Sequence, residues 1–348
     1  MKPAGGNFPP HSIEFMHAIV LISLLTCILM ASAISRLPVL FISHGAAIMT
    51  LDTATQGHAA FVQLGRRLRA EVASLASPSG ITVVMISAHD VRRVTTVSTA
   101  PRIPMIADHP TAAGRTWEAS GDASGATAIL EALKMAGVPV ESGKPSLDHG
   151  AWVPLSLLFP DASGISLVTV SLAAHMDPAE HWRVGEALAP LRSAGFLIIG
   201  SGGATHSQAA FREGYFGGRP AEGVPQQFSS AFNDWLVAAL TSPGVVSIGP
   251  GTVGVAASGT VLRDMEVSRQ RRVSLLEGAP AHPTYAQCHP TPDHWLPLVV
   301  VAGAAGESAA SVAVAGYQHS LSVLSLRFDD PVSSSASEFT VPGLGRAT

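Results

Sequence analysis

Short apolar runs alternate with longer amphipathic segments between residues 38 and 328, and this alternation limits the folds available to the chain. Nearly all-apolar runs rich in β-branched residues are typical of strands buried on both faces of a sheet. They predict strands at Val39–Ser43, Ile81–Ser87, Ile165–Ser171, Phe196–Ser201, Val312–Val314 and Leu321–Phe328. Apolar residues at helical spacing predict helices at Gly57–Ala76, Ala123–Ala136, Pro178–Ser193 and Gln226–Leu240. Such alternation predicts an α/β fold, a three-layer α/β/α single domain with a central, mostly parallel or mixed sheet.

Histidines follow three of the predicted strands within a few residues. They are His44 in "FISHG", His89 in "ISAHD" and His206 in "GSGGATH". The carboxyl ends of parallel strands meet at one edge of an open α/β sheet, and binding sites form at that edge. Imidazole is the commonest metal ligand in proteins. Two interpretations stay open, either a metal site at this edge or histidines whose hydrogen bonds are satisfied by the backbone where the strands end.

Two further histidines stand where a polar loop enters an apolar segment. In "HPTPDHWLPL", Asp293 favours a helix N-terminus, which would hold His294 rigidly in the first turn, facing the sheet edge. The alternative is that Asp293 caps the helix and His294 only packs. In "SLDHGAWVPL", His149 would point into a cleft while Asp148 caps the helix. His175 also follows a strand, but it lies in the approach to the next helix and is predicted not to bind metal.

Composition and missing motifs exclude several classes of function. Cys27 and Cys288 are the only cysteines, too few for a disulfide framework or a cysteine-rich zinc site, so a metal would be bound mainly by histidine and carboxylate. The net charge of −4 and the absence of a basic stripe argue against nucleic acid as a partner. No strand is followed by G-x-G-x-x-G, and neither a P-loop lysine nor G-x-S-x-G occurs. Nucleotide-cofactor and serine-hydrolase functions therefore lack support.

The two ends of the chain are predicted to lie outside the catalytic domain. Residues 15–33 form an apolar run that ends in a small-x-small pattern, so residues 1–37 resemble a leader. Three interpretations stay open for this leader: a secretory signal, a membrane anchor, or an extension absent from the working protein. Translation from Met30 would give the third and a cytoplasmic protein. Residues 329–348 are polar and serine-rich, which predicts a disordered tail.

Five sequence blocks together resemble a known family. They are "PVLFISHGAAIM", "VVMISAHD", "LDHGAWVPLSLLFPDA", "LIIGSGGATHS" and "HPTPDHWLPLVVVAGAAG". In this order they are similar to blocks of the class III extradiol ring-cleavage dioxygenases, the LigB-like family, and most of all to its 4,5-DOPA dioxygenase branch. The resemblance covers about residues 38–327 and implies a three-layer α/β fold with one non-haem metal ion.

The resemblance also implies roles for individual histidines. It aligns His44, His89 and His294 with metal ligands. It aligns His206 with a histidine beside the metal, which is the expected general base and acid and is a fourth ligand in some members. His149 aligns with a substrate-facing histidine of catalytic importance. A site of two histidines and Asp293 is a lesser alternative.

The implied function is the opening of a DOPA-like catechol with O₂ to give a muconic-semialdehyde-type product. The implied cofactor is one divalent ion, Fe(II) or Zn(II). The alternative is a zinc-binding protein of the same fold, with a hydrolase or binding role and no oxygenase activity, because histidines hold zinc at least as readily as iron. The chain departs from the family at Ala46, Ala47 and Asp90. A carboxylate at position 90 would reshape the pocket, bind a substrate amine or join the metal.

Overall fold

A mixed sheet forms the centre of the protein. The computed structural model describes residues 36–75, 80–218, 226–241, 254–255 and 269–330. Within these residues, nine strands pair in the order β11 (Gly254–Val255), β12 (Ala309–Ala315), β15 (Ser325–Asp329), β1 (Val39–Ser43), β10 (Phe196–Gly202), β2 (Ile81–Ser87), β8 (Ile165–Thr169), β6 (Glu118–Gly121) and β5 (Arg102–Pro104). The five strands from β1 to β6 in this order are parallel, and the strands outside them pair antiparallel. The predicted mixed sheet is confirmed.

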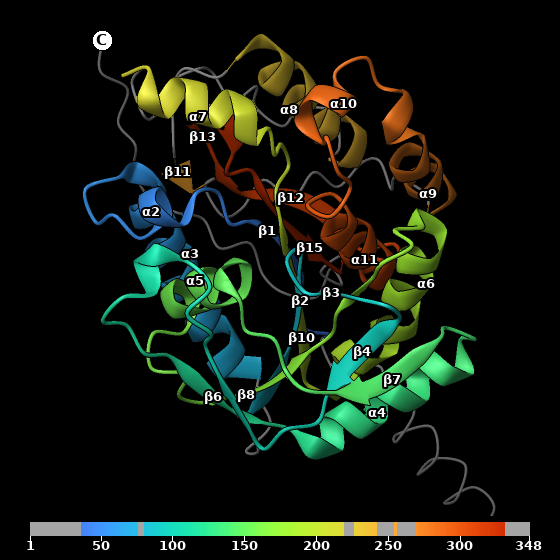
Figure 1. The fold of residues 1–348 in the computed structure, drawn as a ribbon. Helices are drawn as coiled ribbons and strands as arrows, with labels where there is room; N and C mark the ends of the chain where they lie inside the picture. The colour runs from blue at the N-terminus through green and yellow to red at the C-terminus, as the bar shows by residue number, and fades with distance from the viewer. Residues whose placement is uncertain (1–35, 76–79, 219–225, 242–253, 256–268, 331–348) are drawn as a thin grey trace, which may run out of the picture. The chain divides into compact units, whose positions relative to one another are not determined.

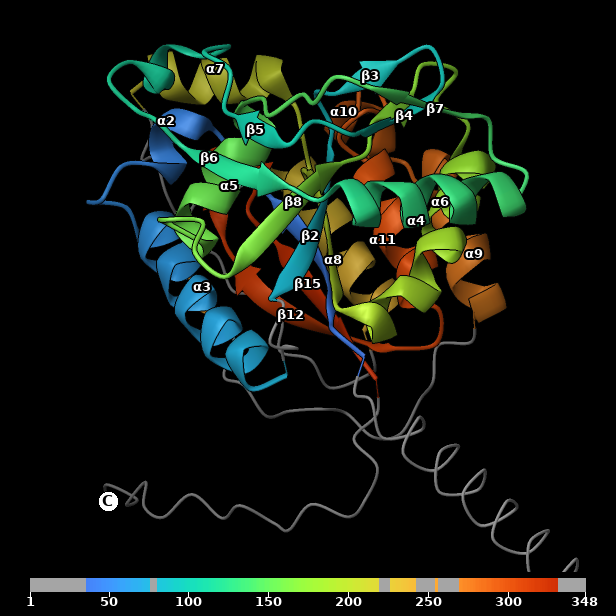
Figure 2. The ribbon, with the colours of Figure 1, turned by 90° about the horizontal axis from the view of Figure 1, so that it is seen from below.

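Helices cover both faces of this sheet, as Figures 1 and 2 show. On one face lie α3 (Gln56–Leu75) and α5 (His149–Leu158). On the other lie α4 (Ala123–Met135), α6 (Pro178–Leu188) and α11 (Leu296–Ala305). Every residue of β1, β2 and β10 is buried, because these central strands are covered on both faces. The three-layer α/β/α fold is therefore confirmed.

Several shorter helices, 3₁₀ turns and strand pairs lie around the main sheet. The remaining helices are α2 (Ala47–Thr50), α7 (Gln208–Phe216), α8 (Gln227–Leu240), α9 (Arg269–Gly278) and α10 (Tyr285–Cys288). The 3₁₀ turns are η1 (Pro110–Ala112), η2 (Ala189–Ala194) and η3 (Ala279–Ala281). Within the described ranges, three small pairs lie outside the main sheet: β3 (Val91–Arg92) with β9 (Leu172–Ala173), β4 (Thr95–Ser98) with β7 (Val140–Gly143), and β13 (Tyr317–Gln318) with β14 (Leu321–Ser322).

Some predicted boundaries were wrong for identifiable reasons. The helix predicted at 178–193 ends at Leu188 and continues as the 3₁₀ turn η2, because Pro190 has no N–H with which to continue the α-helical ladder. The strand predicted at 321–328 is two strands, β14 and β15, that belong to different sheets. The strand β15 also extends to Asp329, one residue into the predicted tail.

The domain begins at least as early as Leu37, one residue inside the predicted leader. The Leu37 side chain is buried, and its N–H donates to the carbonyl of Arg192. The apolar run 15–33, Met30 and the tail beyond Asp330 lie outside the described residues. No helix in the described part of the chain has the length and apolar character that crossing a membrane requires.

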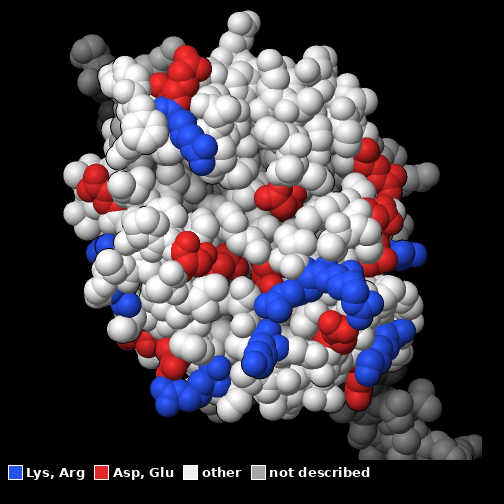
Figure 3. Space-filling model, in the orientation of Figure 1, with Lys and Arg blue, Asp and Glu red and all other residues white. Residues whose placement is uncertain are grey.

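Two buried arginines bind the end of α11, the helix that follows His294. The Arg192 guanidinium donates to the carbonyl of Ala305 at 3.4 Å, and Arg272 donates to the carbonyl of Gly306 at 2.6 Å. Both cations lie where the helix dipole is negative and carbonyl groups lack helical partners, which stabilises this end. On the face drawn in Figure 3, most Lys and Arg side chains gather in the lower half with acidic side chains among them, and much of the upper half is uncharged.

Candidate metal centre

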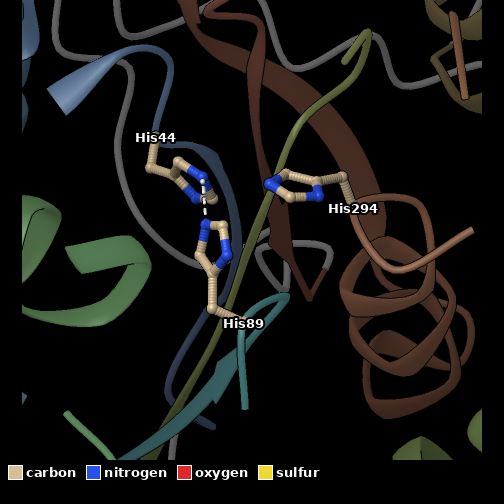
Figure 4. A group of neighbouring side chains, drawn as sticks. All are labelled: His44, His89 and His294. Carbon is tan, nitrogen blue, oxygen red and sulfur yellow. Dashed lines mark hydrogen bonds between the residues drawn. The ribbon is translucent and has the colours of Figure 1, made fainter. Parts of the chain in front are cut away.

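Three histidines from distant parts of the sequence converge at the carboxyl edge of the parallel strands. His44 directly follows β1, His89 lies two residues after β2, and His294 lies two residues before α11. One ring nitrogen from each lies within 4.8 Å of the others, and Figure 4 shows the rings pointing toward one another. The His44 and His89 Nε2 atoms are 3.4 Å apart. The parallel arrangement of β1, β10 and β2 brings His44 and His89 to this edge, and the loop before α11 brings His294 to them.

Hydrogen bonds fix the orientation of two of these rings. The Ser201 hydroxyl donates to the carbonyl of Gly150, so it must accept from His44 Nδ1, which lies 3.0 Å away. On the other side, His294 Nδ1 donates to Asp293 Oδ2 at 2.6 Å. In both rings the Nε2 atom is left to face the cluster. A carboxylate or hydroxyl behind a ligating histidine is the usual way in which proteins orient a metal site.

The three imidazoles fit a divalent metal ion. His294 is buried, and its Nε2 atom has no hydrogen-bond partner within the described structure. A buried nitrogen without a partner is costly unless another group binds it. Since three imidazole nitrogens suit Zn(II) and Fe(II) alike, the arrangement is a histidine-rich potential metal site without identifying the ion.

The protein environment keeps these imidazoles neutral. Burial, reinforced by the neighbouring imidazoles, lowers the pKa of His44 well below its usual value. Desolvation, followed by the effect of His294, lowers the pKa of His89 to about 3. Burial also lowers the pKa of His294, although Asp293 opposes this effect. A metal binds only neutral imidazole, so the site is prepared for metal at neutral pH.

The metal-free protein should lose stability as the pH falls below about 6.5. Burial lowers the pKa of His289 to about 3, and burial followed by His294 lowers the pKa of His206 to about 2. Between the ordinary and lowered pKa values, unfolding takes up protons, so the free energy of unfolding decreases with falling pH. We expect about 1.4 kcal/mol per pH unit from buried His289 and less from His206, which borders the cavity. Denaturant titrations of chelator-treated protein between pH 7.5 and 5 measure this slope. The variant His206→Gln should have a smaller slope. A free energy of unfolding that does not change with pH would contradict the prediction.

His206 lies beside the cluster but is not a member of the group formed by His44, His89 and His294. It belongs to a second, overlapping group with Asp293 and His294. The His206 ring stacks on the His294 ring with a centroid distance of 3.3 Å and an interplanar angle of 6°. Its Nε2 atom is hydrogen-bonded to the side-chain amide of Gln208 at 2.9 Å. His206 therefore lies next to the group formed by His44, His89 and His294.

Asp293 and His149 lie close to the three clustered histidines, but neither belongs to their group. Asp293 does not join His44 and His89; its carboxylate binds the ring of His294. Burial raises the pKa of Asp293, but the hydrogen bond from His294 and the other lowering interactions together outweigh burial and hold that pKa below its usual value. His149 is the first residue of α5, and its ring centroid lies 4.2 Å from that of His89. Gly150 permits this approach, because a Cβ there would lie 2.5 Å from His89 Cδ2.

Neither potential metal group includes Asp90, His175 or His289. Asp90 forms an ion pair with Arg92 at 2.6 Å and belongs to neither potential metal group. His175 pairs with Glu180 at 2.8 Å, outside both groups. His289 is hydrogen-bonded through Nε2 to the carbonyl of Ala204, so it supports the loop that follows β10.

A small cavity opens in front of the histidines, with a volume of about 110 Å³. Its lining combines imidazoles with small apolar or aromatic side chains: His44, Gly45, Ala46, Ala47, Ile48, His89, His109, His149, His206, Gln208 and Phe211. A concave site into which several polar groups converge is typical of small-molecule binding. Sequence reasoning missed His109 and Gln208. For Gln208, its position two residues after His206 was an available signal.

The C-terminal hairpin, formed by β13 and β14, holds the loops that carry His44 and His206. The Gln318 side chain accepts from the Ala46 N–H at 2.8 Å, and Gly45, with φ of 61°, forms the tight turn against it. The carbonyl of Ser320 accepts from the Thr205 hydroxyl at 2.9 Å. One hairpin therefore links two loops that are about 160 residues apart in the sequence.

Comparisons with known proteins agree with this architecture. The family model described as "Catalytic LigB subunit of aromatic ring-opening dioxygenase" matches residues 38–325. The chain is 30% identical over 280 residues to the 4,5-DOPA dioxygenase extradiol of Beta vulgaris, covering 77% of this chain and 87% of that protein. It is 28% identical over 299 residues to the 4,5-DOPA dioxygenase extradiol of Escherichia coli strain K12, covering 84% and 95% respectively.

A solved structure shares the fold. The crystal structure of an uncharacterized protein from Escherichia coli K12 superposes with a TM-score of 0.61 at 26% identity, covering 84% of this chain and 100% of that one. The family match spans most of the described domain, including all of the histidines at the sheet edge. The chain therefore belongs to the LigB family of aromatic ring-opening dioxygenases.

Proposed function

We propose that residues 38–328 form a metal-dependent extradiol dioxygenase that opens the ring of a DOPA-like catechol with O₂. The expected product is a yellow compound of the muconic-semialdehyde type. The observation that carries the proposal is the convergence of three neutral imidazoles, two of them oriented by hydrogen bonds, beside a small cavity. The names of the relatives, 4,5-DOPA dioxygenase extradiol, support a catechol as the substrate.

We assign the metal to His44, His89 and His294. When bound, a redox-active ion such as Fe(II) would supply the activation of O₂ and would increase the acidity of a bound catechol hydroxyl. Zn(II) has no redox chemistry, so the reaction would require a redox-active ion such as Fe(II). Asp293 and Ser201 orient two of the ligands through hydrogen bonds to His294 and His44.

The remaining residues of the cavity would bind the substrate and move protons. We assign His206 as the base that accepts a proton from a catechol hydroxyl and later returns it, because its ring lies beside the metal group and borders the cavity. His149 would face the substrate from the opposite wall. Ile48 and Phe211 contribute apolar surface against a flat aromatic ring.

Oxygen uptake by metal-loaded protein tests the proposal. Protein that begins at Met30 is loaded anaerobically with Fe(II) and then given L-DOPA, caffeate and protocatechuate in turn. We expect oxygen consumption and a yellow product with at least one catechol, and neither with a zinc-loaded control. If iron-loaded protein with stoichiometric metal consumes no oxygen with any catechol, the zinc-binding alternative without oxygenase activity becomes the better account.

A further inference from the structure

We propose that Asp108 is a positioning residue that holds His149 in one orientation and one tautomer for contact with the substrate. This inference rests on the proposed function, since it assigns Asp108 a role through a histidine of the same cavity. Asp108 lies 41 residues before His149, in the loop between β5 and η1. Neither the sequence motifs nor the metal groups include Asp108.

The contacts of Asp108 are directed at the start of α5. Its Oδ2 atom accepts from the backbone N–H of His149 at 2.9 Å and lies 2.7 Å from the Nδ1 atom of the same residue. Its Oδ1 atom lies 3.4 Å from the Trp152 indole nitrogen, one helical turn further on. A single carboxylate therefore contacts both the main chain and the ring of His149. Such paired contacts restrict rotation of the ring more than one hydrogen bond would.

Asp108 has the capping role that usually belongs to the residue just before a helix. Asp148 is the N-cap residue of α5, but its side chain makes no capping hydrogen bond and instead accepts from the Ser87 hydroxyl at 2.7 Å. The carboxylate at this helix N-terminus thus comes from another loop, where it is also favoured by the helix dipole. The loop is tied to the segment before α5, because the Ile106 N–H donates to the carbonyl of Leu147 at 2.9 Å.

The charge of Asp108 determines the tautomer of His149. Partial burial raises the pKa of Asp108, but the hydrogen bonds from the His149 backbone and ring lower it by more, so the carboxylate is ionised at neutral pH. An ionised carboxylate only accepts hydrogen bonds, so His149 Nδ1 must carry a proton. In the neutral ring, Nε2 at the opposite edge then holds a lone pair. Because His149 lines the cavity beside His89, this lone pair can accept from a substrate hydroxyl.

Removing the carboxylate should release the ring. In Asp108→Ala, His149 can rotate and exchange tautomers, and we expect kcat/KM to fall about tenfold to 100-fold with metal content unchanged. In Asp108→Asn, the amide oxygen can still accept from both His149 groups, so kcat/KM should stay within about threefold of the parent. Asp122→Ala is the matched control, because Asp122 caps the N-terminus of α4 away from the cavity. It should lose about 1 kcal/mol of stability and keep its turnover.

A double-mutant cycle separates positioning from general stability. If Asp108 acts through His149, the double variant Asp108→Ala/His149→Ala should be no slower than His149→Ala alone. If the two losses multiply, Asp108 does not act through His149 and the inference is wrong. Full activity in Asp108→Ala would also overturn it.

A spectroscopic readout distinguishes failure of this inference from failure of the proposed function. Long-range ¹H–¹⁵N NMR correlations report which His149 nitrogen carries the proton. We expect the Nδ1–H form in the parent and in Asp108→Asn, and a mixture in Asp108→Ala. If the parent consumes no oxygen with any catechol but shows this pattern, the proposed function fails and the positioning role stands. An unchanged tautomer in Asp108→Ala would refute the positioning role whatever the activity.

Discussion

Replacing His294 by alanine should abolish metal retention and lower oxygen uptake by about three orders of magnitude or more. Of the three clustered histidines, His294 is the one on the helix side of the site, and its Nε2 atom has no hydrogen-bond partner in the described residues. Without it, only His44 and His89 remain from the group. Two imidazoles seldom hold a divalent ion against dialysis. Metal analysis after dialysis and an oxygen electrode measure the two effects.

His175→Ala is the matched control for this prediction. His175 also follows a strand, but it pairs with Glu180 outside both potential metal groups. We expect this variant to keep its metal and its turnover. Circular dichroism should show that His294→Ala remains folded, because Arg192 and Arg272 still bind the end of α11. Stoichiometric metal in folded His294→Ala would mean that another residue completes the site.

Replacing His206 by alanine should lower kcat about 100-fold to 10,000-fold while leaving most of the metal bound. Most of the metal should remain bound because His206 lies outside the group formed by His44, His89 and His294. Burial, followed by His294, lowers the pKa of His206 to about 2 in the metal-free protein, so the ring is neutral and one of its nitrogens can accept a proton. A negatively charged catecholate beside the ring would favour the protonated form and allow proton transfer.

Metal content distinguishes the two roles that His206 could have. If His206→Ala loses its metal together with its activity, His206 is a fourth ligand and not only a base. His206→Gln is the informative companion, because glutamine keeps a polar side chain beside Gln208 but cannot act as a base at neutral pH. We expect it to be as slow as the alanine variant and to retain as much metal.

The strands and the convergence of histidines were the most predictable parts of the structure. The predicted bounds of β1 and β2 are confirmed, because strands buried on both faces contain hardly any polar residue. Once three such strands are parallel, the topology brings His44, His89 and the loop of His206 to one edge. For these residues, local pattern and tertiary structure agree.

The partners of the histidines could not be predicted in the same way. Asp148 and Asp293 have the sequence context of helix caps, yet their carboxylates bind Ser87 and His294 instead. Asp108 lies in a loop without regular periodicity, and only the folded chain brings it to His149. Contacts of this kind depend on how loops that are distant in the sequence pack together, and one sequence alone predicts such packing poorly.

The pairing of β1 between β10 and β15 has a consequence for biosynthesis. A nascent chain that has just passed His294 contains every histidine of the site, but it still lacks β15 and the C-terminal hairpin that secures the loops of His44 and His206. The ribosome adds about 5–20 residues per second, so it completes the missing segment within seconds. Only then can the two loops form their hydrogen bonds to the hairpin. The loops of His44 and His206 are therefore secured only after residues 317–329 have been translated, which is later than every histidine of the site.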